Sequence, residues 1–292
     1  MIKVVSWNIG KRHDPWRELV QMADDGDADL ALLQEVGSPP GDLVDRIDYS
    51  HGVFWNWQLC DRWPLVVKLS DRVTVEPYRQ VPPTSELGGD LIGVSGIGTI
   101  AAARVLPHGN EEESFVAVSM YASWLRVHPS SNSSWIYSDA SAHRIISDLS
   151  TFIGHSDPAK HRILAAGDLS MFYGSTGWRL SLPDRDRTVW DRMQALGLEF
   201  LGPQAPHGRQ SETQPDDVPP DTKNVPTYSH RAGPEAAVNQ LDYAFSSRGF
   251  HEQVSVRAMN EIEEWGSSDH CRLLIEIKCD GESRQPLTGP PR

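Results

Sequence analysis

The chain has 292 residues, of which 39% are hydrophobic and 23% are charged, a composition typical of soluble globular proteins. Its length suits one large domain or two small ones. The formal net charge of −13 argues against a protein that coats duplex nucleic acid, because such binders are usually basic. Any action on phosphates therefore needs local positive charge or bound cations.

The apolar runs, the N-terminal segment and the cysteines indicate the expected localisation of the protein. No apolar run approaches the roughly 18 residues that a membrane span needs. Met1 leads at once into a strand-like segment, without the pattern of a signal peptide. Three cysteines give no disulfide framework. We therefore expect a cytoplasmic protein with no membrane contact and no obligate protein partner.

Hydrophobic periodicity predicts mostly short strands with three helices between them. One helix starts at Asp14, with Asp14 as its N-cap, and two more cover 138–153 and 188–196. The proline- and glycine-rich stretch 202–226 is predicted to be a long loop. We expect one domain over 1–280 and a polar tail over 281–292. The predicted strands are 2–7, 29–33, 54–59, 65–69, 72–75, 98–105, 115–121, 162–167, 241–246 and 271–278.

The last predicted strand has a clear apolar face. Five residues of one parity line that face and are expected to be buried. Asp269 and His270 stand immediately before it, on the lip of the predicted sheet. A carboxylate and an imidazole fixed side by side suit acid–base work or polarisation of a phosphate. The five residues are Cys271, Leu273, Ile275, Ile277 and Cys279.

Polar or ionisable residues stand at the ends of several predicted strands. Asp242 lies between Leu241 and Tyr243, and an acid inside an apolar strand is costly unless it is paired. Neighbouring strands of one sheet bring such ends together, and ligands commonly bind there. The strand-end residues are Asn8, Gln34, Glu35, Tyr121, Asp168, Asp242, Asp269 and His270.

The chemistry of this set indicates a metal. Clustered carboxylates without a cysteine and histidine ligand set favour a hard cation with oxygen ligands, Mg²⁺ or Mn²⁺, over zinc. Such an ion neutralises phosphate charge and can activate water.

These motifs resemble the endonuclease/exonuclease/phosphatase superfamily, the group around pancreatic-type deoxyribonuclease and the apurinic-site repair nucleases. The resemblance covers roughly residues 2–278 and implies an α/β fold, a four-layer sandwich of two mixed β-sheets flanked by helices. The motifs, in the order of the superfamily, are Ser6-Trp7-Asn8, Leu33-Gln34-Glu35, Tyr121, Gly167-Asp168, Leu241-Asp242-Tyr243 and Ser268-Asp269-His270-Cys271.

The resemblance also implies a role for each site residue. Glu35 would be the principal Mg²⁺ ligand, with Asn8 beside it and Asp269 as a further carboxylate near the metal. Asp168 would orient or deprotonate the attacking water. His270, held by Asp242, would contact the scissile phosphate. Tyr121 would donate a hydrogen bond to a phosphate oxygen.

Three positions depart from the pattern of the superfamily. Ser170 stands where an asparagine is usual, and its hydroxyl is shorter than a carboxamide and offers one donor instead of two. Gly10 stands where the repair nucleases carry an aspartate, which weakens a second metal subsite. Trp124 stands where they carry an asparagine.

Three functions stay open at this point. The first is a metal-dependent phosphodiesterase that hydrolyses nucleic acid by in-line attack of water. The second is a phosphatase or phosphodiesterase for a small molecule or a lipid headgroup, which the acidic charge tolerates better. The third is a weakened or non-catalytic phosphate-binding homologue, motivated by Ser170.

Overall fold

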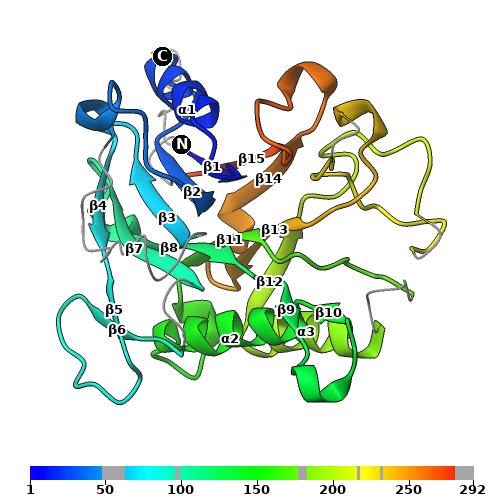
Figure 1. The fold of residues 1–292 in the computed structure, drawn as a ribbon. Helices are drawn as coiled ribbons and strands as arrows, with labels where there is room; N and C mark the ends of the chain where they lie inside the picture. The colour runs from blue at the N-terminus through cyan, green and yellow to red at the C-terminus, as the bar shows by residue number, and fades with distance from the viewer. Residues whose placement is uncertain (48–62, 96–98, 177–182, 216–217, 231–232, 280–292) are drawn as a thin grey trace, which may run out of the picture.

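The structure is a computed structural model that describes residues 1–47, 63–95, 99–176, 183–215, 218–230 and 233–279. Two large mixed sheets pack face to face, with α1 outside one sheet and α2 and α3 outside the other (Figure 1). This arrangement confirms the predicted four-layer sandwich. Across the described ranges, none of the helices has the length and apolar character that crossing a bilayer requires.

The first sheet has five strands in the order β14-β15-β1-β2-β3. β1 runs parallel to β2 and antiparallel to β15, so the first and last strands of the fold are neighbours. The strands are β1 (Ile2–Asn8), β2 (Leu30–Val36), β3 (Trp63–Lys68), β14 (Val254–Met259) and β15 (Arg272–Ile277).

The second sheet has six strands in the order β12-β13-β11-β8-β7-β4. β11 is parallel to β8 and antiparallel to β13. The strands are β4 (Val73–Pro77), β7 (Ile100–Pro107), β8 (Phe115–Tyr121), β11 (Ile163–Asp168), β12 (Leu198–Gly202) and β13 (Asp242–Ser247). Two small two-stranded sheets pair β5 (Arg79–Val81) with β6 (Leu91–Gly93) and β9 (Leu125–Arg126) with β10 (Ile136–Tyr137).

Alternation along the strands builds three apolar layers. Val4 and Leu32 face the second sheet, and Ala166 meets them from the other side. Their neighbours in sequence face outward, where α1 (Asp14–Asp24) covers them with Trp16 and Leu19. α2 (Asp139–Leu149) and α3 (Pro183–Ala195) cover the far side of the second sheet. Each buried large side chain contributes about 1.5–3 kcal/mol, so the three layers fix the stacking of the sheets.

The structure corrects several sequence-based expectations. The N-cap of α1 is His13, and Asp14 is the first helical residue, with Pro15 in the first turn. Helix α3 includes Pro183, so it begins at least five residues before the predicted Thr188. The expected strand over 54–59 and the expected tail over 281–292 lie outside the described residues. The strands without a clear apolar signal were not predicted: β5, β6, β9, β10, β12 and β14.

The registers bring the predicted strand ends to one edge. Asn8 at the end of β1 lies opposite Gln34, which precedes Glu35 on β2. In the second sheet, Asp168 at the end of β11 lies opposite both Tyr121 on β8 and Asp242 on β13. The two sheets therefore present their polar strand ends on the same side of the sandwich.

Gly167 generates a prediction about this edge. Its φ is +152°, and an added Cβ would lie 2.0 Å from the carbonyl oxygen of Met120 on β8. Gly167→Ala must therefore push β11 away from β8 next to Asp168. We expect a loss of roughly 3 kcal/mol or more in the free energy of unfolding, measured by urea denaturation.

Gly154→Ala is the matched control, because nothing lies within 4 Å of its added Cβ. That variant should unfold within about 0.5 kcal/mol of the wild-type protein. Equal unfolding midpoints for the two variants would contradict the tight contact at Gly167.

Candidate active site

A line of hydrogen bonds joins the ends of four strands. The hydroxyl of Tyr121 donates to Glu35 Oε1 at 3.0 Å. The carboxamide nitrogen of Asn8 donates to the same oxygen at 3.4 Å and to Asp168 Oδ2 at 2.9 Å. Asn8 thus bridges the two carboxylates, and it does so across the two sheets.

The line continues to His270. Its Nε2 lies 3.9 Å from Asp168 Oδ2, and its Nδ1 lies 2.8 Å from Asp242 Oδ2. The longer distance exceeds a hydrogen bond and leaves room for an atom that contacts both groups. Asp242, whose backbone N–H donates to the Thr227 hydroxyl, is anchored at the start of β13.

Burial and charge set the protonation of these groups. Burial raises the pKa of the Asp168 carboxyl, and the nearby His270 opposes part of that rise. Burial alone would lower the pKa of His270, but the charge of Asp242 and its hydrogen bond outweigh burial and raise it. The arrangement therefore favours an imidazolium beside a carboxyl group that readily accepts a proton.

His270 is more deeply placed than the sequence suggested. We expected it on an open lip, but only 4% of the residue is exposed. Trp7 Nε1 donates to its carbonyl oxygen at 2.8 Å, and the ring of Tyr228 lies 4.8 Å from its ring. Removal of the imidazole would leave the buried Asp242 carboxylate unpaired and would destabilise the fold, so His270 has a structural role as well as a chemical one.

Two site residues adopt a left-handed backbone without being glycine. Glu35 has φ +46° at an irregularity in the pairing of β2 with β3, and Ser170 has φ +49°. Such conformations cost about 1–3 kcal/mol and cluster at functional sites. Ser170 also holds Asp168, because its backbone N–H and its hydroxyl reach Oδ1 at 2.6 and 3.2 Å.

Asp269 has a different setting from the other carboxylates. Its Oδ1 lies 3.5 Å from the guanidinium of Arg12 and accepts a hydrogen bond from Ser268 at 3.2 Å. Within the described part of the chain, no group of three or more His, Cys, Asp or Glu side chains has an arrangement that could hold a metal ion.

The donor set nevertheless fits a single hard cation. Glu35 offers a carboxylate and Asn8 a carboxamide, and Mg²⁺ commonly takes one or two protein ligands and keeps several waters. In the structure the amide nitrogen of Asn8 faces Glu35 and Asp168, while Asn8 Oδ1 accepts from the backbone N–H of Gly10 at 3.0 Å, so Oδ1 would bind the ion only after the carboxamide turns.

Sequence reasoning missed the residues that support the catalytic candidates. Thr227 accepts hydrogen bonds from the backbone N–H groups of Leu241 and Asp242, and Tyr228 packs on His270. Both follow the 202–226 loop and carry no periodic signal. The sequence predicted the loop but did not indicate that the residues directly after it reach the site.

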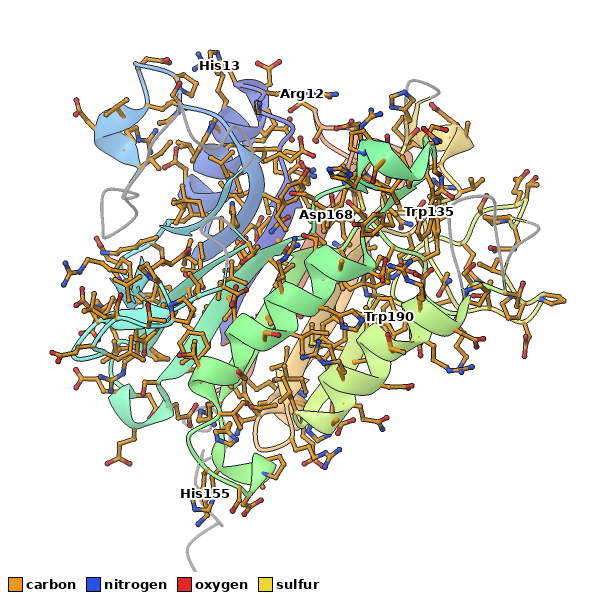
Figure 2. The ribbon with its side chains drawn as sticks, turned by 60° about the horizontal axis from the view of Figure 1, so that its bottom comes forward. Arg12, His13, Trp135, His155, Asp168 and Trp190 are labelled. Carbon is orange, nitrogen blue, oxygen red and sulfur yellow. The ribbon has the colours of Figure 1, made fainter. Side chains whose placement is uncertain are left out.

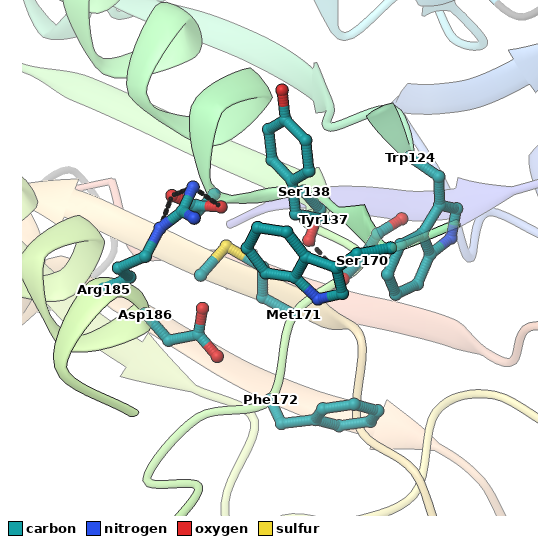
Figure 3. Close-up of a pocket in the computed structure, with 10 residues that line it drawn as sticks. Trp124, Tyr137, Ser138, Ser170, Met171, Phe172, Arg185 and Asp186 are labelled. Atoms are coloured by element: carbon teal, nitrogen blue, oxygen red, sulfur yellow. Dashed lines mark hydrogen bonds and ion pairs between the residues drawn. The ribbon is translucent and has the colours of Figure 1, made fainter. Parts of the chain in front are cut away.

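A second cleft adjoins the site at Ser170. Figure 3 shows Trp124 and Ser170 on one side of this cleft and Asp186 across from them. Arg185 binds the Asp139 carboxylate at 2.6–2.9 Å, and its charge opposes only part of the rise in the pKa of Asp186. Figure 2 shows His155 at the bottom of the molecule, well away from Asp168 near the centre of the view, so His155 takes no part in either site.

Comparison with known proteins places the fold. No protein-family profile matches the chain, and no curated protein matches it in sequence. Solved structures do match over almost the whole chain. The 3'-5' exonuclease NExo from Neisseria meningitidis has a TM-score of 0.61 at 14% identity, over 95% of this chain and 100% of that one.

Two further structures show the same likeness. The AP endonuclease LMAP from Leishmania major has a TM-score of 0.60 at 13% identity, over 95% of this chain and 88% of that one. A mannosyl-6-phosphatase from Bacteroides thetaiotaomicron has a TM-score of 0.56 at 13% identity, over 96% and 100%. The fold is that of endonuclease/exonuclease/phosphatase structures, which confirms the resemblance stated from the motifs.

Asp186 generates a prediction about pH. Burial raises the pKa of its carboxyl to about 6 from an ordinary value of 3.8; Asp139 adds to the rise and Arg185 opposes it. The folded protein therefore holds this proton more tightly than the unfolded chain does. Its contribution favours the folded state below about pH 4 and is lost as the pH rises through about 6.

Asp186→Asn should remove this loss of folding stability at higher pH. We expect the free energy of unfolding to rise by about 1 kcal/mol at pH 7, allowing for solvent screening, and to change little at pH 4. Urea denaturation at both pH values measures the difference. The exposed Asp191→Asn serves as control, and an equal effect of the two substitutions would contradict the assignment to Asp186.

Proposed function

We propose that this protein is a divalent-metal-dependent phosphodiesterase, and specifically a nuclease that hydrolyses phosphodiester bonds of nucleic acid. The observation that carries this proposal is the line of contacts from Glu35 through Asn8 to Asp168 and His270. Around one gap it brings together a carboxylate suited to binding a metal (Glu35), a proton acceptor (Asp168) and a cationic hydrogen-bond donor (His270). Solved nucleases with the same fold, an exonuclease and an AP endonuclease, support the same assignment.

Each side chain has a role in this proposal. Glu35 and Asn8 would hold Mg²⁺ or Mn²⁺, which supplies charge neutralisation at the phosphate when it is bound. Asp168 orients the attacking water and accepts its proton. The imidazolium of His270 donates to a phosphate oxygen, with Asp242 fixing its ring.

Two assigned residues have a less direct place. Tyr121 donates to Glu35 in the structure, and we propose that it turns this donor toward a phosphate oxygen when substrate is bound. Asp269 stays a proposed metal-side carboxylate that Arg12 holds in position until the metal binds.

A phosphatase or phosphodiesterase acting on a small phosphoester is the second candidate. The net charge of −13 disfavours wide contact with a nucleic-acid backbone. Among structures with the same fold is the mannosyl-6-phosphatase. The same groups would serve this reaction, so the substrate assay has to separate the two.

The non-catalytic reading has less support. Ser170 does hold Asp168 through two hydrogen bonds, so the shorter side chain still meets the proposed base. We therefore propose a working enzyme.

The test is hydrolysis of a substrate panel with Mg²⁺, with Mn²⁺ and with EDTA. The panel contains single-stranded DNA, duplex DNA, abasic DNA, RNA and small phosphoesters. We expect cleavage of a nucleic acid that requires the metal. Glu35→Gln should lower the rate at least 100-fold, because it removes the charge that holds the ion.

The control variant is Glu76→Gln, a carboxylate more than half exposed on β4. It should keep wild-type activity. Full hydrolysis in EDTA, or an undiminished rate in Glu35→Gln, would contradict metal catalysis at this site. Hydrolysis of small phosphoesters alone would select the second candidate function.

Ser170 generates a separate prediction. Asparagine tolerates the left-handed backbone at this position better than serine and offers two donors instead of one. Ser170→Asn should therefore raise kcat about tenfold, which equals roughly 1.4 kcal/mol of transition-state stabilisation. KM should change less, because the contact matters most as charge develops.

Steady-state kinetics on the preferred panel substrate measures this effect. Ser170→Ala is the companion variant, since it keeps the backbone N–H to Asp168 and loses only the hydroxyl. We expect it to be slower than the wild-type enzyme. Unchanged or lower turnover in Ser170→Asn would mean that the site is adapted to the hydroxyl.

A further inference from the structure

Trp124 is a large apolar side chain that the fold leaves uncovered. It is 40% exposed, at the start of the β9–β10 hairpin and three residues after Tyr121. An exposed indole has no stabilising role in the core, and its position coincides with a departure from the superfamily pattern. The side chain lines the mouth of the cleft next to Ser170 (Figure 3).

The hairpin that carries Trp124 is held rigidly. Trp135 stacks on Tyr137 with ring centroids 5.1 Å apart. The guanidinium of Arg185 lies 4.9 Å from the Trp135 ring and 5.3 Å from the Tyr137 ring, while it binds Asp139. A preorganised wall of this kind loses little conformational freedom when a ligand binds.

The hairpin is also tied to the proposed catalytic groups. The hydroxyl of Ser138, directly after β10, donates to the carbonyl oxygen of Ser170 at 2.7 Å. At the other end, the backbone N–H of Ala122 donates to the carbonyl oxygen of Asp168 at 2.8 Å. Both ends of the segment that carries Trp124 are therefore tied to the Asp168–Ser170 turn, next to the place where His270 would contact a phosphate.

Charge and shape restrict what the cleft can hold. Its described lining has two carboxylates, Asp139 and Asp186, and one guanidinium, Arg185, so it repels a second phosphate. The enclosed part, about 10 Å³, holds at most one water molecule, which leaves the exposed face of Trp124 as the contact surface. The favoured occupant is an uncharged flat ring.

We propose that Trp124 is a stacking subsite for an unpaired nucleobase, the base of the nucleotide that adjoins the phosphate bound at His270. This inference rests on the proposed function and names its substrate class. A base inside a duplex has both faces covered, so only a single-stranded or extruded base can stack here. Asp186, which has no hydrogen-bond partner among the described residues, can accept from an amino group on the base edge.

The subsite also resolves the difficulty of the acidic charge. A chain with net charge −13 gains little affinity from counterion release along a phosphate backbone. Stacking on an aromatic ring does not depend on charge, and one stacked base contributes measurably to binding. Stacking on Trp124 therefore accounts both for binding and for specificity for unpaired bases.

The experiment measures binding without turnover. The ligands are the tetranucleotide of thymidine and the same backbone with a tetrahydrofuran in place of every base, titrated calorimetrically in EDTA. The wild-type protein should bind the thymidine ligand about tenfold more tightly. Trp124→Ala should abolish that ratio, and Trp124→Phe should keep most of it. With metal present, KM for the thymidine ligand should rise about tenfold in Trp124→Ala, with a smaller change in kcat.

Leu87→Ala is the control, because Leu87 is 55% exposed in the loop before β6, away from this cleft. It should keep the wild-type ratio. A base-dependent ratio that survives in Trp124→Ala would overturn the proposal. So would binding of mannose 6-phosphate, but not of the thymidine ligand, that depends on Trp124.

These results separate the two proposals. If no panel substrate is hydrolysed but the ratio depends on Trp124, the stacking subsite stands and the proposed catalysis falls. If hydrolysis requires metal and the ratio is indifferent to Trp124, the catalysis stands and the subsite falls.

Discussion

The buried contact between His270 and Asp242 is the interaction on which the site depends. His270 lies two residues before β15 of the first sheet, and Asp242 begins β13 in the second, so their 2.8 Å contact spans the sandwich. A buried ion pair adds little net stability over a hydrophobic pair, because desolvation offsets the attraction. Its value here is geometric, since it fixes the ring and the position of the two sheets together.

Further polar contacts between the two sheets follow along the edge of the sandwich. The hydroxyl of Ser119 on β8 donates to the carbonyl oxygen of Leu33 at 2.7 Å, and Gln34 donates to that hydroxyl at 2.9 Å. With Asn8 and Asp168, these contacts make a polar seam beside the apolar layer between the sheets. Sliding one sheet past the other would break the whole seam, so the geometry of the candidate site and the stacking of the sheets are coupled.

The sequence predicted the features that follow from the two-residue period of a β-strand. Alternation along the last strand predicted a buried face, and Cys271, Leu273, Ile275 and Ile277 are buried in the structure, whereas Cys279 beyond the end of β15 is only partly buried. Asn8 and Glu35 met because β1 and β2 are parallel neighbours, and Tyr121 and Asp168 met because β8 and β11 are. Asp242 and His270 reach the same edge because they stand at the beginnings of strands antiparallel to β11 and β1. The sequence could not place Thr227 or Tyr228, because their contacts arise from tertiary folding of a loop and leave no periodic trace. The depth of His270 was also invisible, since it depends on Trp7 from the opposite end of the chain.

Backbone conformation is the second feature of the site that the sequence did not predict. Glu35 and Ser170 carry positive φ angles that glycine would adopt more easily, so each holds its place against a local preference. The compensation is specific: the backbone N–H of Lys11 donates to the Glu35 carbonyl at 2.8 Å, and that of Ser170 donates to Asp168. Glycine at either position would relieve strain but would remove the carboxylate or the hydroxyl. The site thus retains functional side chains where the backbone alone would favour none, and the surrounding hydrogen bonds hold the two strained turns in register with the strand ends.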